Sequence, residues 1–236
     1  MIAPPLQRLT LAAGDELLDH PDADPAVVRE SLRDISIANR WFGGWWAVRR
    51  GLSRVLAGVP GGTRLTLLDI GTGAGDLPLL AVDWAARRGI TLVPLGVERH
   101  PAAAHMARQQ GVPTLLGCAG ALPVRAGGVD LVLASQLVHH LAPPAIVDFC
   151  RATNKIARHG VVIADLRRSP LALAGFWLGS RLLGFDATTK ADGLTSVRRG
   201  FTAPELVVLL RQAGIVASVE RRPGFRLVAA WRSATA

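Results

Sequence analysis

The chain has 236 residues, 50% of them hydrophobic and 19% charged, so it can bury a sizeable core and is not a disordered protein. Its formal net charge is +9, but nearly all the basic residues are arginines spread along the whole chain. A nucleic-acid-binding protein usually gathers its charge in a stripe or a tail, so nucleic acid is disfavoured as a partner. Weak association with an anionic membrane surface stays open.

Targeting, membrane and redox signals are all weak. The N-terminus lacks the basic flank and apolar core of a signal peptide. The longest apolar stretch, residues 171–185, contains Arg181 and falls short of the ~20 residues that a spanning helix needs. Cys118 and Cys150 are too few for a disulfide framework or a metal site. We therefore expect a cytoplasmic protein without a bound metal.

Residues 1–60 show helical patterns and no strand signal, which predicts a helical N-terminal cap. Asp24 followed by Pro25 is typical of a helix start, with an N-cap before a proline in the first turn. The stretch "NRWFGGWW" at 39–46 interrupts this helix. A basic amphipathic helix follows to about Leu56.

From residue 61 onward, strands alternate with helices. Five short apolar runs are typical of the buried strands of a parallel sheet, and they lie at 65–70, 91–98, 112–117, 129–135 and 160–166. Helical patterns between them lie at about 76–88, 101–110 and 143–158. This order predicts a Rossmann-like, doubly wound α/β domain over residues 61–236.

The last third adds an insert and a hairpin. A helical pattern at about 169–184 lies within residues 168–200, which we expect to act as a lid. Thr202 and Glu205 form a capping box that starts another helix. Two apolar runs then flank a Pro-Gly turn at 223–224. The predicted sheet thus has seven strands and is mostly parallel, with a C-terminal antiparallel strand.

A glycine-rich turn follows the first predicted strand, in the stretch "LLDIGTGAGDLP". Its three glycines stand at alternate positions, Gly71, Gly73 and Gly75. Asp69 precedes them, and Glu98 ends the second strand, where a carboxylate can accept bonds from both hydroxyls of a ribose. The loop has no basic residue to bind a phosphate. This pattern indicates a nucleoside ligand with a compact cationic or zwitterionic tail.

Four stretches together resemble the successive motifs of class I S-adenosylmethionine (SAM)-dependent methyltransferases: "LLDIGTGAGDLP", "GVERHP", "GCAGALPVRAGGVDLVLASQLVHHL" and "GVVIADL". The resemblance covers residues 65–166 well and 200–232 in outline. It is closest to the small-molecule, methyltransferase type 11-like branch, with its S-x-x-x-HH-L after the fourth strand. It implies SAM as the cofactor and S-adenosylhomocysteine as the product.

The resemblance also implies which residues hold the cofactor. The glycines form the loop against it, Asp69 supports its methionine end, and Glu98 holds its ribose. The full expected set is Asp69, Gly71, Thr72, Gly73, Gly75, Asp76, Glu98, Arg99, Cys118, Ala119 and Ser135. Cys118 stands where family members often carry an Asp that bonds the adenine amine. We expect a backbone carbonyl to replace that contact, or the contact to be missing, and Cys118 to be an apolar pocket wall.

Two histidines and an acid supply a candidate general base. His139 and His140 follow the fourth predicted strand, and Asp165 ends the fifth. Adjacent strand ends bring such groups within reach, and a carboxylate orients an imidazole and stabilises its charged form. We predict that His139 is the base and that Asp165 orients it. His140 is expected to be a structural residue that caps the helix beginning near Pro143.

Aromatic residues in the helical segments are candidates for an apolar acceptor pocket. We expect Trp41, Phe42 and Phe176 to line it, and Arg198 or Arg199 to bind an acidic group of the acceptor. These features predict an enzyme of secondary metabolism that methylates a phenolic or polyketide-like molecule at oxygen.

The sequence leaves two alternative functions open and disfavours a third. A C-methyltransferase of quinone-type rings and a non-catalytic SAM-binding regulatory subunit stay open. An RNA methyltransferase is disfavoured, because "SQLVHH" replaces the N/D-P-P-Y/F motif and the chain has no tyrosine.

Overall fold

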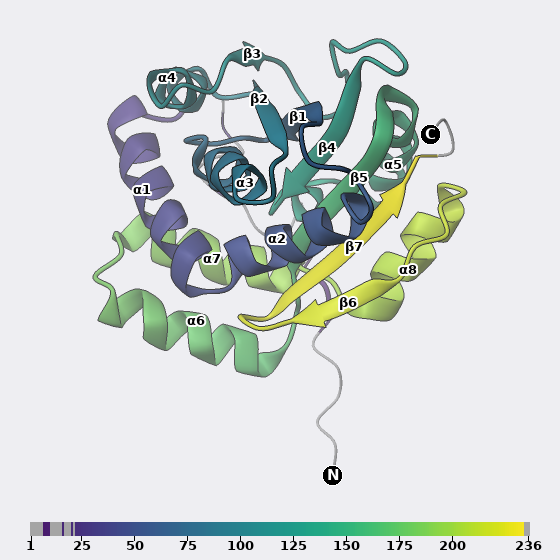
Figure 1. Ribbon diagram of the computed structural model, residues 1–236. Coiled ribbons are helices and arrows are strands. Elements are labelled where there is room, and N and C mark those ends of the chain that lie inside the picture. Colours follow the sequence, from purple (N-terminus) through teal and green to yellow (C-terminus); the bar gives the residue numbers. More distant parts are fainter. Residues whose placement is uncertain (1–6, 10–15, 17–19, 21, 234–236) are drawn as a thin grey trace.

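The computed structural model describes residues 7–9, 16, 20 and 22–233, and a seven-stranded sheet forms its centre (Figure 1). The strands are β1 (Arg64–Ile70), β2 (Thr91–Glu98), β3 (Thr114–Leu116), β4 (Val129–Ser135), β5 (Ala157–Leu166), β6 (Val219–Arg222) and β7 (Arg226–Arg232). Their spatial order is β3-β2-β1-β4-β5-β7-β6. The first five strands pair in parallel, and β7 is antiparallel to both β5 and β6. The predicted doubly wound fold and its antiparallel end are confirmed.

Helices cover both faces of the sheet because successive strand residues point to opposite sides. On one face, α5 (Pro143–Ile156) and α8 (Ala203–Gln212) pack against strand residues such as Val132. On the other, α2 (Gly44–Val55) and α3 (Asp76–Ala86) pack against neighbours such as Leu133. Both sides of each central strand are therefore buried, which explains the nearly continuous apolar runs in the sequence.

The N-terminal helices begin and break as predicted. The Asp24 side chain accepts a hydrogen bond from the Ala26 N–H (2.7 Å) at the start of α1 (Pro25–Trp41). The chain then turns at Gly43, which has a φ of 80°. Because α2 packs on β5 and β7, it forms part of the core layer. A boundary between cap and domain at residue 60 stays a prediction.

The insert after β5 contains two helices, whereas the sequence predicted one. The first is α6 (Pro170–Leu182), and the second is α7 (Ala187–Arg199), which begins at the N-cap Asp186. The polar, threonine-rich sequence of α7 gives a weak helical signal, and its packing on α6 and α1 supplies the missing stabilisation. Gly193 has no side chain, so the Phe176 ring can lie directly against α7.

Two boundaries differ from the predicted ones. β5 starts directly after α5, and β3 is shorter than its apolar run.

Among the described helices, none is both long and apolar enough to cross a membrane.

Candidate active site

A pocket of about 320 Å³ lies at the carboxyl ends of β1, β2 and β4, where the strand order reverses. Open α/β sheets bind ligands at this switch point. Residues of α1, α6 and α7 wall the pocket, so the helical segments outside the sheet complete it. The expected cofactor-binding residues all line it except Gly75. Gly75 instead has a φ of 83° and turns the chain into α3, and its expected contact with the cofactor stays a prediction.

Glu98 holds the glycine loop and the start of the next helix together. One of its carboxylate oxygens accepts from the backbone N–H of Gly73 (2.9 Å). The other accepts from the N–H groups of Arg99 (2.7 Å) and His100 (3.0 Å), just before α4 (Pro101–Gln109). The carboxylate at the end of β2 therefore fixes the backbone around the pocket before any ligand enters.

Asp69 is a buried carboxylate with unused hydrogen-bonding capacity. Its Oδ2 accepts from the Thr72 hydroxyl (3.0 Å), whereas its buried Oδ1 has no hydrogen-bond partner. Burial is the main reason why the pKa of Asp69 lies well above its usual range, and the charges of Asp76 and Glu98 raise it further. An unsatisfied acceptor that lines a pocket is available for a cationic or hydrogen-bond-donating ligand.

This arrangement predicts opposite effects of Asp69→Asn on stability and binding. A carboxyl whose pKa is raised by folding lowers stability as pH rises above its unfolded value of about 3.9. Removing the charge should therefore raise the melting temperature at neutral pH, by about 2–4 °C for each kcal/mol gained in the free energy of unfolding. The same change should weaken SAM binding roughly tenfold. Thermal melts at pH 4 and pH 7, with calorimetric titration, test both effects, and an equal gain at both pH values would contradict this explanation.

A chain of polar side chains links α1 to the last strand beneath the pocket. The Asn39 amide donates to Asp76 (3.0 Å) and accepts from Gln136 (2.7 Å), and Gln136 accepts from Arg226 (2.8 Å). Arg226 also donates to the backbone oxygen of Phe42 (3.0 Å). Burial lowers the pKa of Arg226 to about 10. The sequence analysis missed this chain, although an arginine inside the apolar run of β7 was a signal that it has buried partners.

His139 and Asp165 form a buried pair at the edge of the pocket. The His139 Nδ1 lies 2.7 Å from an Asp165 oxygen, and both side chains are almost fully buried. Burial alone would raise the pKa of Asp165, but His139 and the backbone N–H of Leu166 outweigh it and lower that pKa. An ionised carboxylate only accepts hydrogen bonds, so the His139 Nδ1 carries the proton. The Nε2 is left without a hydrogen-bond partner in a side chain that lines the pocket.

His140 does not have the predicted capping role. The N-cap of α5 is Ala142, which makes no side-chain cap. The His140 ring instead lies against the His139 ring, with centroids 4.2 Å apart. Its Nε2 is 3.8 Å from Glu16, which also lines the pocket and accepts from Ser196 (2.5 Å).

Among the described residues, one group of three His, Cys, Asp or Glu side chains has potential metal-ligand atoms that all lie within 4.8 Å of one another. It consists of Glu16, His139 and His140. The Glu16 oxygens already accept from Arg199 (2.9 Å) and Ser196 (2.5 Å). The expectation that no metal is bound stays a prediction. Chelation with EDTA should therefore leave the methylation rate unchanged, and rescue of a chelated enzyme by Zn²⁺ would contradict it.

Aromatic side chains form part of the pocket wall, but only part of the predicted set reaches it. Phe176 lines the pocket together with the buried Phe185. Trp41 is 74% exposed and lies outside the lining, and Phe42 packs behind Phe176 with ring centroids 6.0 Å apart. Neither forms a wall of the described pocket, contrary to the sequence-based expectation.

Neither predicted arginine lies in the pocket lining. Arg198 is exposed, and its contact with an acceptor stays a prediction. Arg199 is buried and paired with Glu16 (2.9 Å). Its charge neutralises that of Glu16, so Arg199 supports the pocket wall from behind.

Comparisons with known proteins agree with this geometry. A SAM-dependent methyltransferase from Aquifex aeolicus is 16% identical with a TM-score of 0.59, over 89% of this chain and 98% of that one. Magnesium protoporphyrin IX methyltransferase from Synechocystis PCC 6803, with bound S-adenosylhomocysteine, is 15% identical with a TM-score of 0.53, over 81% and 84%. A candidate O-methyltransferase from Nostoc punctiforme is 17% identical with a TM-score of 0.54, over 84% and 59%. No protein of curated function matches the sequence.

The strand order, the glycine loop and the two strand-end carboxylates define a class I SAM-dependent methyltransferase. Residues 68–164 match the family model described as a methyltransferase domain. The enzymes of this class take their methyl group from SAM.

Proposed function

We propose that this methyltransferase transfers the methyl group of SAM to a hydroxyl oxygen of an apolar, phenolic or polyketide-like acceptor. The observation that carries the proposal is the His139–Asp165 pair, whose free Nε2 lines a pocket with an aromatic wall. We place the enzyme in the cytoplasm, because Cys118 and Cys150 are both free thiols.

The residues around the pocket fit SAM. The unpartnered Oδ1 of Asp69 is suited to the positively charged methionine end. Glu98 can exchange one of its backbone hydrogen bonds for those of the ribose hydroxyls. Cys118 lies exposed at the rim, and its neighbour Ala119 also lines the pocket, so the adenine meets a largely apolar edge.

SAM supplies an already activated methyl group, so the chain mainly has to align and deprotonate the acceptor. Asp165 fixes the ring of His139 through Nδ1, so the unpartnered Nε2 is left to accept a proton. The hydroxyl proton moves to Nε2 as the oxygen–methyl bond forms and the sulfur–methyl bond breaks, which leaves S-adenosylhomocysteine, and Asp165 stabilises the resulting imidazolium. The proton leaves to solvent after product release, which returns His139 to its starting state.

The pocket walls supply selection and exclude water. Phe176 and Phe185 offer aromatic surface, and Leu137 and Leu141 beside the histidines add apolar surface. We propose that residues 168–200 act as a lid, because α6 and α7 form one wall and their departure would open the acceptor side. A second role as a non-catalytic subunit has no support in a site with an oriented base.

The direct test is turnover. Purified protein with SAM should methylate simple alkyl-substituted phenols, and mass spectrometry should locate the new methyl on oxygen. Methylation at ring carbon would instead identify the quinone-type alternative. Binding of S-adenosylhomocysteine without turnover of any phenol or quinol would favour the regulatory-subunit alternative.

Glu98 tests the cofactor side separately. Glu98→Ala removes three backbone hydrogen bonds and the expected ribose contacts, each charge-assisted bond being worth about 1.5–3 kcal/mol. We expect SAM affinity to fall by about 10–100-fold, together with a lower melting temperature. Glu98→Gln keeps one acceptor oxygen, so its SAM affinity should lie between those of the wild type and Glu98→Ala. Unchanged calorimetric affinity in Glu98→Ala would contradict the assignment.

A further inference from the structure

Helix α6 is apolar on both sides. Phe176 and Ser180, four residues apart, face inward, where Phe176 lines the pocket and Ser180 is fully buried. Leu171, Leu178 and Leu182 repeat at helical spacing on the opposite side, and they are 72%, 53% and 78% exposed. A helix that is hydrophobic all round is normally buried, so the outward side of α6 calls for a partner.

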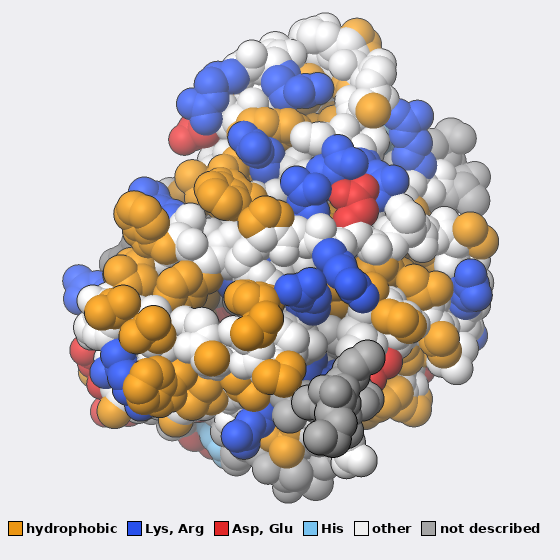
Figure 2. All heavy atoms as spheres, turned by 90° about the horizontal axis from the view of Figure 1, so that it is seen from below, with side chains coloured by type: hydrophobic (Ala, Val, Ile, Leu, Met, Phe, Trp, Pro, Cys, Tyr) orange, Lys and Arg blue, Asp and Glu red, His pale blue; other side chains and the backbone are white. Residues whose placement is uncertain are grey.

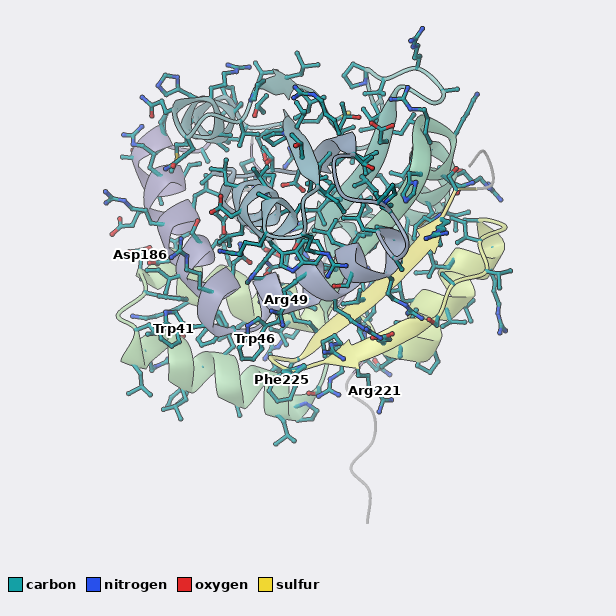
Figure 3. The ribbon with its side chains drawn as sticks, in the orientation of Figure 1. Trp41, Trp46, Arg49, Asp186, Arg221 and Phe225 are labelled. Atoms are coloured by element: carbon teal, nitrogen blue, oxygen red, sulfur yellow. The ribbon has the colours of Figure 1, made fainter. Side chains whose placement is uncertain are left out.

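Exposed tryptophans extend this apolar surface beyond α6. Trp46 on α2 is 51% exposed, and Trp41 lies at the end of α1, while Trp177 on α6 itself is 48% exposed. Figure 3 shows Trp41 and Trp46 on the side of the molecule where α6 lies, and the contact of Phe42 with Gly179 ties the two segments together. We call these side chains the outer face: Trp41, Trp46, Leu171, Trp177, Leu178 and Leu182.

The charge around the outer face is positive. The only charged residue of α6 is Arg181, which lies 4.0 Å over the Trp177 ring. Beside the outer face, Trp46 and Trp84 line a groove of about 590 Å³ whose charged residues are all arginines: Arg49, Arg50, Arg88 and Arg222. Glu220 pairs with Arg50 (2.8 Å) and lies 3.8 Å from Arg222, so it neutralises part of this charge, and the groove stays net positive. Figure 2 shows hydrophobic side chains with Lys and Arg between them on this side of the molecule, and few acidic ones.

We propose that the outer face docks on an anionic phospholipid bilayer, with α6 lying in the plane of the surface. With 13 residues, α6 is too short to span the ~30 Å hydrocarbon core. Leucines and tryptophans at an exposed helix surface insert at the level of the headgroups, and arginines beside them reach the lipid phosphates. A second copy of the chain is a poorer partner, because a symmetric contact would bring the same arginines against each other.

The position of α6 gives this docking a consequence, which rests on the proposed function. One side of the helix would touch lipid while the other side, through Phe176, lines the acceptor pocket. An acceptor dissolved in the bilayer could therefore enter the pocket along α6 without crossing water. The acceptor would then be an apolar molecule that partitions into the membrane.

Vesicle sedimentation tests the docking with the full-length protein. Wild type should bind mixed vesicles of phosphatidylglycerol and phosphatidylcholine. Its binding should fall at least about tenfold when the vesicles are pure phosphatidylcholine, or when the mixed vesicles are assayed in high salt. Leu178→Glu/Leu182→Glu should lower binding to the anionic vesicles at least about tenfold. Val216→Glu is the matched control, because Val216 is 97% exposed and lies outside the outer face.

Calorimetric titration with S-adenosylhomocysteine shows that each variant is folded and separates this inference from the proposed function. Normal cofactor binding with lost vesicle binding in the leucine variant supports docking. Equal binding of wild type to neutral and anionic vesicles, or equal loss in Val216→Glu, would overturn it. A dimer that dissociates in Leu178→Glu/Leu182→Glu would overturn it as well, since it would show that a second copy covers the outer face.

Discussion

His139→Ala should lower kcat by about 10²–10⁴-fold, the usual contribution of a general base, while SAM still binds normally. The reason is the geometry of the buried pair, in which Asp165 holds Nδ1 at 2.7 Å and leaves Nε2 as the free proton acceptor at the pocket. Steady-state kinetics with a phenol of pKa near 10 measures this loss. An acceptor of much lower pKa, already ionised at neutral pH, should lose far less.

Two further variants separate catalysis from folding. His139→Ala also leaves Asp165 without its ring partner, so a loss of stability could lower the rate. His139→Gln keeps a hydrogen-bond donor near Asp165 but cannot take the proton, so it should fold and still lose most of its rate. Asp165→Asn should lose less rate, because the imidazolium loses its counter-charge but Nε2 is kept as the proton acceptor. Full activity in His139→Gln would refute the mechanism.

Gly73→Val should raise the dissociation constant for SAM by at least about a hundredfold, which is about 2.7 kcal/mol. Gly73 has a φ of 55°, a conformation that a β-branched residue adopts only with strain. A Cβ there would lie 3.2 Å from the Leu32 side chain, and the rest of a valine would project into the pocket that the glycine loop lines. Calorimetric titration measures the change directly.

Gly58→Val is the matched control for this loop. Gly58 also has a positive φ, 79°, but a Cβ there would meet no atom within 4 Å, and the residue lies outside the pocket. It should show the cost of backbone strain in the melting temperature and leave SAM affinity unchanged. If both variants bind SAM like the wild type, the glycine loop does not form the cofactor site.

The sequence predicted the parts of the site that strand ends impose. Buried parallel strands appear as apolar runs, and polar residues directly after them must meet at one edge of the sheet. Asp69, Glu98, His139 and Asp165 were all found on this ground, and the structure brings them around one pocket or directly behind it.

Side chains whose positions depend on distant packing were not predictable in the same way. Arg199 was expected to face an acceptor, but its partner Glu16 lies 183 residues away in the chain. The exposed position of Trp41 depends on where α1 ends over α6. No local sequence pattern predicts such contacts, because they form only when helical segments that are distant in the sequence pack against each other.

The polar chain beneath the pocket has a consequence for how the enzyme forms during synthesis. Arg226 bonds to Gln136 and to the backbone of Phe42, which lies 184 residues earlier. The ribosome releases α1 well before the arginine that fastens its end, which follows Phe42 by 184 residues. The nascent chain can pair β1 to β5 and still lack a complete pocket wall. Such late, long-range closure is slow compared with local folding, so the enzyme becomes competent to hold its cofactor only after β7 has joined the sheet.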